Sequence, residues 1–481
     1  MRLTLGGNTV ATTVATAIVV FLGGCASVPA TDVARHPKNI IFFLGDGMGM
    51  NTLTAARIYA VGEAGELTLD TLPESAFVKT FANNAQVTDS AASMTAYMTG
   101  RKVNNGVLSM STDTDSIEPG PDSSGNKTVS RCTGGSPAVT LGELAKQRGM
   151  AVGVVTTTRV TDATPAAVYA HACHRGMETD IAAALVPGGA LYNKALGAHG
   201  LDVLLGGGAR AFAGTAKGGI RPDGRDLLSE LRVKGVRTVT DTAQLSAADN
   251  ASNAPLVGLF APENLSYDAA RDPVRDPGLA AMADKAISVL SKNPNGFFMV
   301  VEGGLIDLAL HDTHAKRALQ EVVSFDNTIK ATIARMRVLD PGLKNTLIVV
   351  TADHDHTLLL NGYAPRTGKT TPTNPGVLGL MRKVSDGSLR LDADGMPFTI
   401  IGFGTGEHRV QGKRSSAPAL TDAQVSADDY HQEAVVRTAA GDETHGGTDV
   451  YLGAIGARAD SFGGTIDNTR VFQLIKAAAG W

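Results

Sequence analysis

The sequence lacks a large excess of charge of either sign. Its 481 residues include 43 Lys and Arg against 47 Asp and Glu, a formal net charge of −4. So small an imbalance provides no electrostatic basis for binding a nucleic acid or a membrane surface. Repeats and low-complexity segments are also lacking, and 43% of the residues are hydrophobic. We therefore expect an ordinary globular protein.

Aromatic residues are scarce, at 5% of the chain, whereas glycine is abundant, at 55 residues. Glycine tolerates backbone conformations that other residues avoid, so we expect many tight turns and close backbone approaches. The length would permit two or three domains, but large α/β enzymes often build this many residues around one sheet.

Long apolar runs are missing as well, but the N-terminus has the pattern of an export signal. Arg2 is the only charged residue before an apolar stretch at 10–22, which is too short to span a bilayer comfortably and is soon followed by Cys25. The pattern resembles a bacterial lipoprotein signal. It predicts a signal peptide at 1–24, a diacylated Cys25 and a lipidated tether at 25–37. The alternative is an ordinary signal peptide cleaved nearby. Both predict an exported protein, either periplasmic or anchored to the outer membrane.

Besides Cys25 the chain contains only two cysteines, Cys132 and Cys173. An even pair in an oxidising compartment is expected to form a disulfide. Two buried free thiols are the alternative.

Four apolar segments have the pattern of buried parallel strands that deliver loops, at 39–44, 151–155, 296–301 and 346–350. Helical patterns precede three of them, around 141–148, 278–292 and 314–336. Apolar strands that alternate with helices predict an α/β fold with a doubly wound, mainly parallel sheet. Segment 109–138 reads as a surface loop. Segment 361–440, which includes a strand-like piece at 398–402, reads as an insertion.

Acidic and histidine side chains follow these strands. They are Asp46, Glu302, Asp307, His311, Asp353 and His354, together with His445 further along the chain. Each alone has an ordinary explanation as a helix cap or turn residue. Together they provide the oxygen and imidazole ligands that suit zinc and magnesium, at the sheet edge where such folds bind ligands. Two neighbouring ions can stabilise the attacking and leaving oxygens of a displacement at phosphorus.

A candidate nucleophile, Ser90, leads a run of small residues that we expect to form a helix. A helix N-terminus favours a phosphate, and a nearby zinc ion would lower the pKa of the hydroxyl. The alternative is that Asp89 or Ser90 serves only as an N-cap.

The order of these motifs resembles that of the alkaline phosphatase family. The segments that carry the resemblance are 43–49 (FLGDGMG), 88–96 (TDSAASMTA), 154–166 (VVTTTRVTDATPA), 301–307 (VEGGLID), 351–354 (TADH) and 443–447 (ETHGG). They span roughly residues 38–456. The resemblance implies a catalytic domain at 38–475 with a crown-like insertion at about 361–440, and it implies a homodimer.

The resemblance also implies two Zn²⁺ and one Mg²⁺ per subunit. The matching ligands of the first zinc are Asp307, His311 and His445. Those of the second are Asp46, Asp353 and His354. Those of magnesium are Asp46, Thr164 and Glu302.

The resemblance makes Ser90 the nucleophile, which forms a phosphoserine intermediate. Arg175 takes the place of the arginine that grips two phosphate oxygens, a task that suits the planar guanidinium. Asp162 and His356 match residues that support the metal ligands. Leu308 departs from the family pattern, in which a polar or aromatic residue reaches toward the phosphate or the third metal. His174 and His314 lie beside matched positions but match no ligand, so we interpret both as structural.

The sequence as a whole predicts hydrolysis of small phosphate monoesters. The alternative is a phosphodiesterase or related phosphoryl hydrolase with the same bimetal core. A sulfatase is excluded, because no C/S-x-P-x-R segment occurs. A catalytically silent lipoprotein is disfavoured, since the nucleophile and every matched ligand are present. No nucleic-acid partner is expected, and we expect membrane contact only through the lipidated N-terminus.

Overall fold

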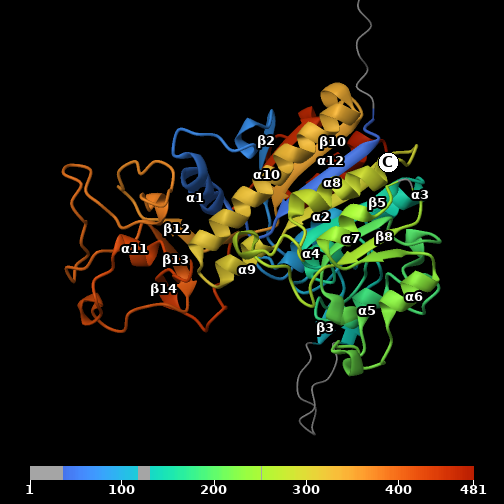
Figure 1. Ribbon diagram of the computed structural model, residues 1–481, viewed down its shortest axis with the longest axis horizontal. Helices are drawn as coiled ribbons and strands as arrows, with labels where there is room; N and C mark the ends of the chain where they lie inside the picture. Colours follow the sequence, from blue (N-terminus) through green and yellow to red (C-terminus); the bar gives the residue numbers. More distant parts are fainter. Residues whose placement is uncertain (1–35, 118–130, 251) are drawn as a thin grey trace, which may run out of the picture. The chain divides into compact units, whose positions relative to one another are not determined.

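A computed structural model describes residues 36–117, 131–250 and 252–481 (Figure 1). The predicted signal peptide, Cys25 and the tether up to residue 35 lie outside the described residues. Among the described residues, no helix is both long enough and apolar enough to cross a membrane.

A ten-stranded sheet forms the centre of the fold. From edge to edge its strands are β17 (Gly464–Asp467), β2 (Glu74–Lys79), β16 (Val450–Gly456), β10 (Thr346–Ala352), β1 (Asn39–Gly45), β9 (Phe297–Gly303), β5 (Ala151–Arg159), β6 (Val203–Gly207), β8 (Leu256–Leu259) and β7 (Arg237–Val239).

The strands from β10 to β7 pair in parallel, and β16 runs antiparallel to both of its neighbours. The four strands expected from the sequence are the adjacent strands β10, β1, β9 and β5. Asn39 at the start of β1 pairs with Thr346 on one side and Phe297 on the other, so these strands begin level with one another. The prediction of a mainly parallel sheet is confirmed.

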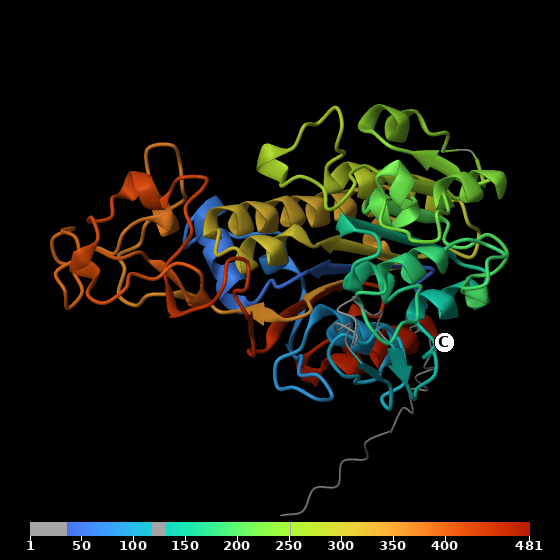
Figure 2. The same ribbon diagram turned by 90° about the horizontal axis from the view of Figure 1, so that it is seen from below.

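Helices cover both faces of the sheet, which explains why the central strands are apolar along their whole length. One layer contains α1 (Met50–Val61), α8 (Leu279–Leu290), α9 (Leu305–His311) and α10 (Ala315–Leu339). The other contains α2 (Ser90–Thr99), α3 (Leu141–Gln147), α4 (Ala163–Ala166) and α12 (Asn468–Ala479). Figure 2 shows α8 and α10 on one side of the strands and the red α12 on the other. Shorter helices lie outside these layers: α5 (Glu178–Ala183), α6 (Leu227–Val233), α7 (Thr242–Ala247) and α11 (Asp422–Val425).

The segment predicted as an insertion contributes β13 (Ile401–Gly406) and β14 (Ala434–Arg437) to a small separate sheet, whose third strand, β12 (Leu358–Leu360), lies directly before the segment. It packs beside α1 (Figure 1). The strand expected at 398–402 begins later, at Ile401. The residues just before it pair elsewhere: Thr399 forms an isolated antiparallel bridge with Leu380, and the N–H of Ile400 donates to the carbonyl of Gly379 at 3.0 Å.

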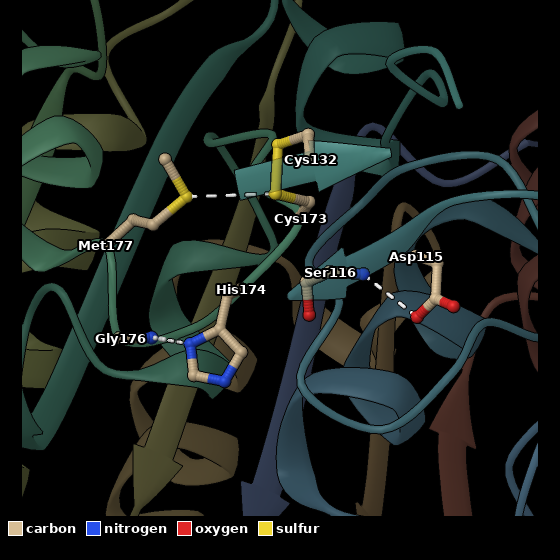
Figure 3. Close-up of a disulfide and its surroundings, with 7 residues drawn as sticks. All are labelled: Asp115, Ser116, Cys132, Cys173, His174, Gly176 and Met177. Carbon is tan, nitrogen blue, oxygen red and sulfur yellow. Dashed lines mark hydrogen bonds between the residues drawn. A yellow bond between two sulfur atoms is a disulfide. The ribbon is translucent and has the colours of Figure 1, made fainter. Parts of the chain in front are cut away.

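The described ends of the predicted surface loop form a two-stranded sheet of β3 (Asp115–Ile117) and β4 (Arg131–Thr133). Cys132 on β4 is joined by a disulfide to Cys173, with the two Cα atoms 5.3 Å apart (Figure 3). The disulfide ties the loop to the segment that leads to Arg175.

Candidate metal and phosphate site

The candidate site lies where the central parallel strands end. Asp46 follows β1, Asp353 and His354 follow β10, and Glu302 is near the end of β9. Helix α9 begins just after β9 and carries Asp307 and His311 four residues apart, on one face. The carboxyl ends of neighbouring parallel strands lie side by side. Residues some 300 positions apart in the sequence therefore come together there.

The first group of acceptors contains Asp46, Asp353 and His354, all buried. His354 places Nδ1 3.2 Å from the carbonyl of Asp355, which assigns the ring proton to Nδ1. Its Nε2 lone pair then faces Oδ1 of Asp46 at 3.4 Å and Oδ2 of Asp353 at 3.2 Å. Oδ2 of Asp353 accepts no hydrogen bond from the described residues. Two carboxylates and an imidazole nitrogen therefore converge here, an arrangement that fits a cation.

Electrostatics in this group agree with that interpretation. Burial raises the pKa of Asp46 well above its ordinary value, and the charges of Asp353, Asp307 and Glu302 raise it further. Burial also lowers the pKa of His354 to about 3. Carboxylates crowded in this way need a positive charge to remain ionised.

The second group contains Asp307, His311 and His445. Nδ1 of His311 contacts the carbonyl of Glu443 at 2.5 Å, and Nδ1 of His445 contacts that of Thr88 at 2.8 Å. Both protons are therefore on Nδ1, and the two Nε2 lone pairs face each other 3.2 Å apart. Oδ1 of Asp307 lies 3.4 and 3.6 Å from these two nitrogens.

The two groups adjoin. The rings of His354 and His445 are stacked, with centroids 3.5 Å apart. Two cations held by these groups would be close neighbours, as a bimetal phosphoryl-transfer centre requires.

His356 lies behind Asp307, with Nε2 2.7 Å from Oδ1 of Asp307 and Nδ1 in contact with the carboxylate of Glu443. Burial opposes protonation of His356, but the charges of Glu443 and Asp307 outweigh it and raise its pKa to about 10. Sequence reasoning assigned no role to Glu443, which also accepts hydrogen bonds from Thr357. The only feature of the sequence that could have indicated a role for Glu443 is its position two residues before His445.

A third group consists of oxygen ligands. The hydroxyl of Thr164 lies 3.4 Å from Oδ2 of Asp46. Glu302 is buried beside them and accepts hydrogen bonds from Thr156 and Thr158. Burial raises the pKa of Glu302 to about 8. An all-oxygen set of this kind suits magnesium.

Ser90 is the first residue of α2, and Asp89 is the N-cap, accepting a hydrogen bond from the backbone N–H of Ala92 at 2.9 Å. The hydroxyl of Ser90 is therefore not used as the cap. Its Oγ lies 3.2 Å from Nε2 of His354 and 3.4 Å from Oδ1 of Asp46.

The guanidinium of Arg175 is held by two carboxylates, 2.9 Å from Asp162 and 3.4 Å from Asp89. Burial opposes its charge, but Asp162 and Asp89 outweigh burial and raise the pKa of Arg175, with a further contribution from Asp46. Asp162 also accepts hydrogen bonds from Arg159 and from the backbone N–H of Ala163. The predicted support of a metal by Asp162 thus stays a prediction, and its contacts here are with the arginines.

Of the two histidines interpreted as structural, His174 accepts a hydrogen bond from the backbone N–H of Gly176 at 3.1 Å. His314 pairs with His431 in a separate cluster. Leu308 is partly exposed on α9, beside Asp307.

Comparison with known proteins identifies the family. The family model described as alkaline phosphatase matches residues 37–481. The tissue-nonspecific alkaline phosphatases of Rattus norvegicus and Homo sapiens are 36% and 35% identical to this chain, over 92% of it and 83% of each relative. The alkaline phosphatase of Gadus morhua is 34% identical, over 92% of this chain and 91% of its own.

Solved structures agree. The alkaline phosphatase of Thermus thermophilus has a TM-score of 0.65 at 25% identity, covering 93% of this chain and 92% of its own. A variant of the TAB5 alkaline phosphatase, described with magnesium bound, has a TM-score of 0.63 at 25% identity, with 93% and 99% covered. The resemblance seen in the motifs is confirmed: this chain belongs to the alkaline phosphatase family.

Proposed function

We propose that this protein hydrolyses phosphate monoesters, with Ser90 as the nucleophile. One observation carries the proposal. The Oγ of Ser90 lies at the N-terminus of α2 and within 3.4 Å of acceptor atoms of Asp46 and His354, which need a cation between them. The relatives named alkaline phosphatase support the same activity.

Two zinc ions and one magnesium ion are the cofactors that the three groups of ligands fit. The first zinc would be held by Asp307, His311 and His445, the second by Asp46, Asp353 and His354, and the magnesium by Asp46, Thr164 and Glu302. Such ions supply Lewis-acid polarisation of phosphoryl oxygens and lower the pKa of a nearby hydroxyl.

The residues of the chain perform the remaining tasks. Oγ of Ser90 forms a bond to phosphorus while the bond from phosphorus to the leaving oxygen breaks, and the leaving group departs as an alcohol after taking a proton. Water then attacks the phosphoserine, which releases inorganic phosphate and restores the Ser90 hydroxyl. The N-terminus of α2 would offer its positive end to the phosphoryl oxygens.

Arg175 orients the phosphate. Asp162 and Asp89 fix its guanidinium, so the side chain is ordered before substrate arrives and loses little freedom on binding. Leu308 offers no polar atom toward the phosphate. We therefore expect phosphate affinity and third-metal preference to differ from those of relatives with a polar residue there.

We also propose that the protein is exported, is anchored through a lipid on Cys25 and forms a homodimer. The apolar stretch before Cys25 supports export. One relative, from Bombyx mori, is named membrane-bound alkaline phosphatase, and it is 32% identical over 94% of this chain. The boundaries of the insertion at about 361–440 also remain a proposal.

The test is hydrolysis of p-nitrophenyl phosphate by the exported protein, with bis-p-nitrophenyl phosphate measured in parallel. Activity is measured as purified, after chelation, and after zinc and magnesium are restored. We expect monoester hydrolysis that disappears on chelation and returns with zinc. Preference for the diester would instead assign the protein to a phosphodiesterase branch, and restoration by calcium or iron alone would contradict the proposed ions.

A further inference from the structure

A second cluster of histidines lies outside the candidate active site. Glu407 and His408 follow β13, and His431 comes shortly before β14. Strands β13 and β14 are parallel neighbours, and the chain after β13 turns back, so that His408 forms an isolated bridge with Glu433, just before β14. Glu407, His408 and His431 thereby lie together, with one ligand atom of each within 4.8 Å of the others.

The polar contacts in this cluster converge on one point. Oε1 of Glu407 lies 2.7 Å from Nδ1 of His431 and 3.2 Å from Nδ1 of His408. The rings of His408 and His431 have centroids 4.8 Å apart. On its other side, Nε2 of His431 lies 2.7 Å from Nε2 of His314, at the start of α10.

Residues next to this cluster in the sequence carry unsatisfied buried polar atoms. Among the described residues, Thr313 Oγ1, His314 Nδ1 and Gln432 Oε1 are buried without a hydrogen-bond partner. Thr313 directly precedes His314 in the sequence, and Gln432 directly follows His431. Buried polar atoms usually have a hydrogen-bond partner in a folded protein, and a bound ion or ordered water can supply one.

We propose that Glu407, His408 and His431 bind a further divalent transition-metal ion, zinc in the first instance. Two imidazoles and a carboxylate suit zinc, whereas calcium and magnesium prefer oxygen ligands alone. The side chain of His408 is 53% exposed, so the ion can enter from solvent and keep a water as a fourth ligand.

His314 acts as a positioning residue in this site. In the structure Nδ1 of His431 also contacts the carbonyl of Asp312, at 2.7 Å, so it carries a proton when no metal is bound. A metal on Nδ1 displaces this one ring proton to Nε2, from which it is donated to Nε2 of His314. Metal-bound histidines are commonly held by such a hydrogen bond.

The site would connect two parts of the chain that matter for activity. Glu407, His408 and His431 belong to the predicted insertion, whereas Asp312 and His314 belong to the turn directly after His311. The backbone N–H of Gln432 also bonds to the carbonyl of Thr313, at 3.0 Å. Through the contact between His431 and His314, a bound ion would therefore fasten the insertion to the turn that follows His311, the proposed ligand of the first zinc.

The experiment counts zinc per chain by mass spectrometry after saturation and dialysis of the full protein. His408→Ala and His431→Gln should each contain about one zinc equivalent less than the unchanged protein. His314→Ala should keep the site but weaken its zinc affinity by about 10- to 100-fold. The matched control is His199→Ala, which removes an exposed histidine elsewhere and should leave the count unchanged.

Equal zinc content in the unchanged protein, His408→Ala and His431→Gln would overturn the proposal. A loss that His199→Ala shares would also overturn it, because it would show adventitious surface binding. His408 is exposed, so its substitution keeps the test decisive even if His431→Gln fails to fold. The zinc count does not depend on catalysis, so this proposal and the proposed phosphatase activity can fail separately.

Discussion

At the scale of single residues, adjacent side chains at the start of α2 have separate duties. Asp89 caps the helix, accepts the N–H of Gly106 at 2.9 Å and contacts Arg175. This leaves the Ser90 hydroxyl free to face the proposed metal ligands. One carboxylate thereby contacts the helix terminus, the neighbouring loop and the arginine that we propose to bind phosphate.

Ser90→Ala should reduce kcat for p-nitrophenyl phosphate by at least about a thousandfold, because it removes the attacking oxygen. Phosphate binding should persist, since Arg175 and the N-terminus of α2 remain. The matched control is Ser93→Ala, which removes a hydroxyl on the same helix that donates to the carbonyl of Asp353. Turnover of Ser90→Ala close to that of this control would refute the assignment.

Arg175→Ala should lower kcat/KM by about 10- to 100-fold, the range set by losing hydrogen bonds to a charged group. Arg175→Lys should recover only part of this, because a point charge cannot replace the two-pronged contact. Steady-state kinetics of both variants provide the measurement. The control is Arg57→Ala, which removes an arginine on α1 and breaks its ion pair with Asp70. Unchanged kcat/KM in Arg175→Ala would place this residue outside the site.

At the scale of elements, α3 begins with a capping box in which Thr140 and Glu143 satisfy each other's backbone N–H groups. The same Glu143 pairs with His171, at 2.7 Å, on the segment that leads to Cys173 and Arg175. Burial disfavours the charge on each, but their mutual attraction prevails. It lowers the pKa of Glu143 below its ordinary 4.5 and raises that of His171 above its ordinary 6.5.

This pair should stabilise the fold in a defined range of pH. The contribution of His171 is complete below pH 6.5 and is lost as pH rises through its raised folded value. The contribution of Glu143 is complete above pH 4.5 and is lost as pH falls through its lowered folded value. The stabilisation of the fold by this ion pair is therefore largest between pH 4.5 and pH 6.5.

We predict that His171→Gln lowers the free energy of unfolding by about 2 kcal/mol at pH 5.5, and by less at alkaline pH. Urea unfolding of both proteins across this range gives the measurement. His199→Gln serves as an exposed control. A stability difference that stays constant from pH 5.5 to pH 9 would show that the ion pair does not contribute as described.

At the scale of the whole molecule, the central sheet brings the proposed metal ligands that follow β1, β9 and β10 together at the carboxyl ends of these strands. His445 approaches from another direction, on β15 (His445–Gly446), which pairs with β11 (Asp355–His356). The register of that pairing sets His356 opposite His445. The second group of acceptors therefore depends on contacts between segments that are far apart in sequence.

The proposed anchoring is also a property of the whole chain. Cys25→Ser should move the protein from the membrane fraction to the soluble fraction of a bacterial host, because the lipid is the only membrane contact that we expect. Incorporation of labelled palmitate, followed by fractionation, provides the measurement. A variant that remains in the membrane fraction would show that another segment holds it there.

The sequence by itself determined the central strands and the ligand candidates. Continuous apolar segments must be buried on both faces, and the four expected strands are β1, β5, β9 and β10. Spacing also placed Asp307 and His311 on one helical face. These features are local, so they can be recognised along the chain.

Only the tertiary structure decided the contacts between distant segments. Glu443 lies behind His356, Asp89 contacts Arg175, and His314 faces His431 across 117 residues. Nothing in the local sequence around these residues specifies a partner, because each pairing follows from which strand ends and turns the packed core brings to the same place. Folding therefore fixed the residues that orient the predicted ligands, and it revealed the second histidine cluster.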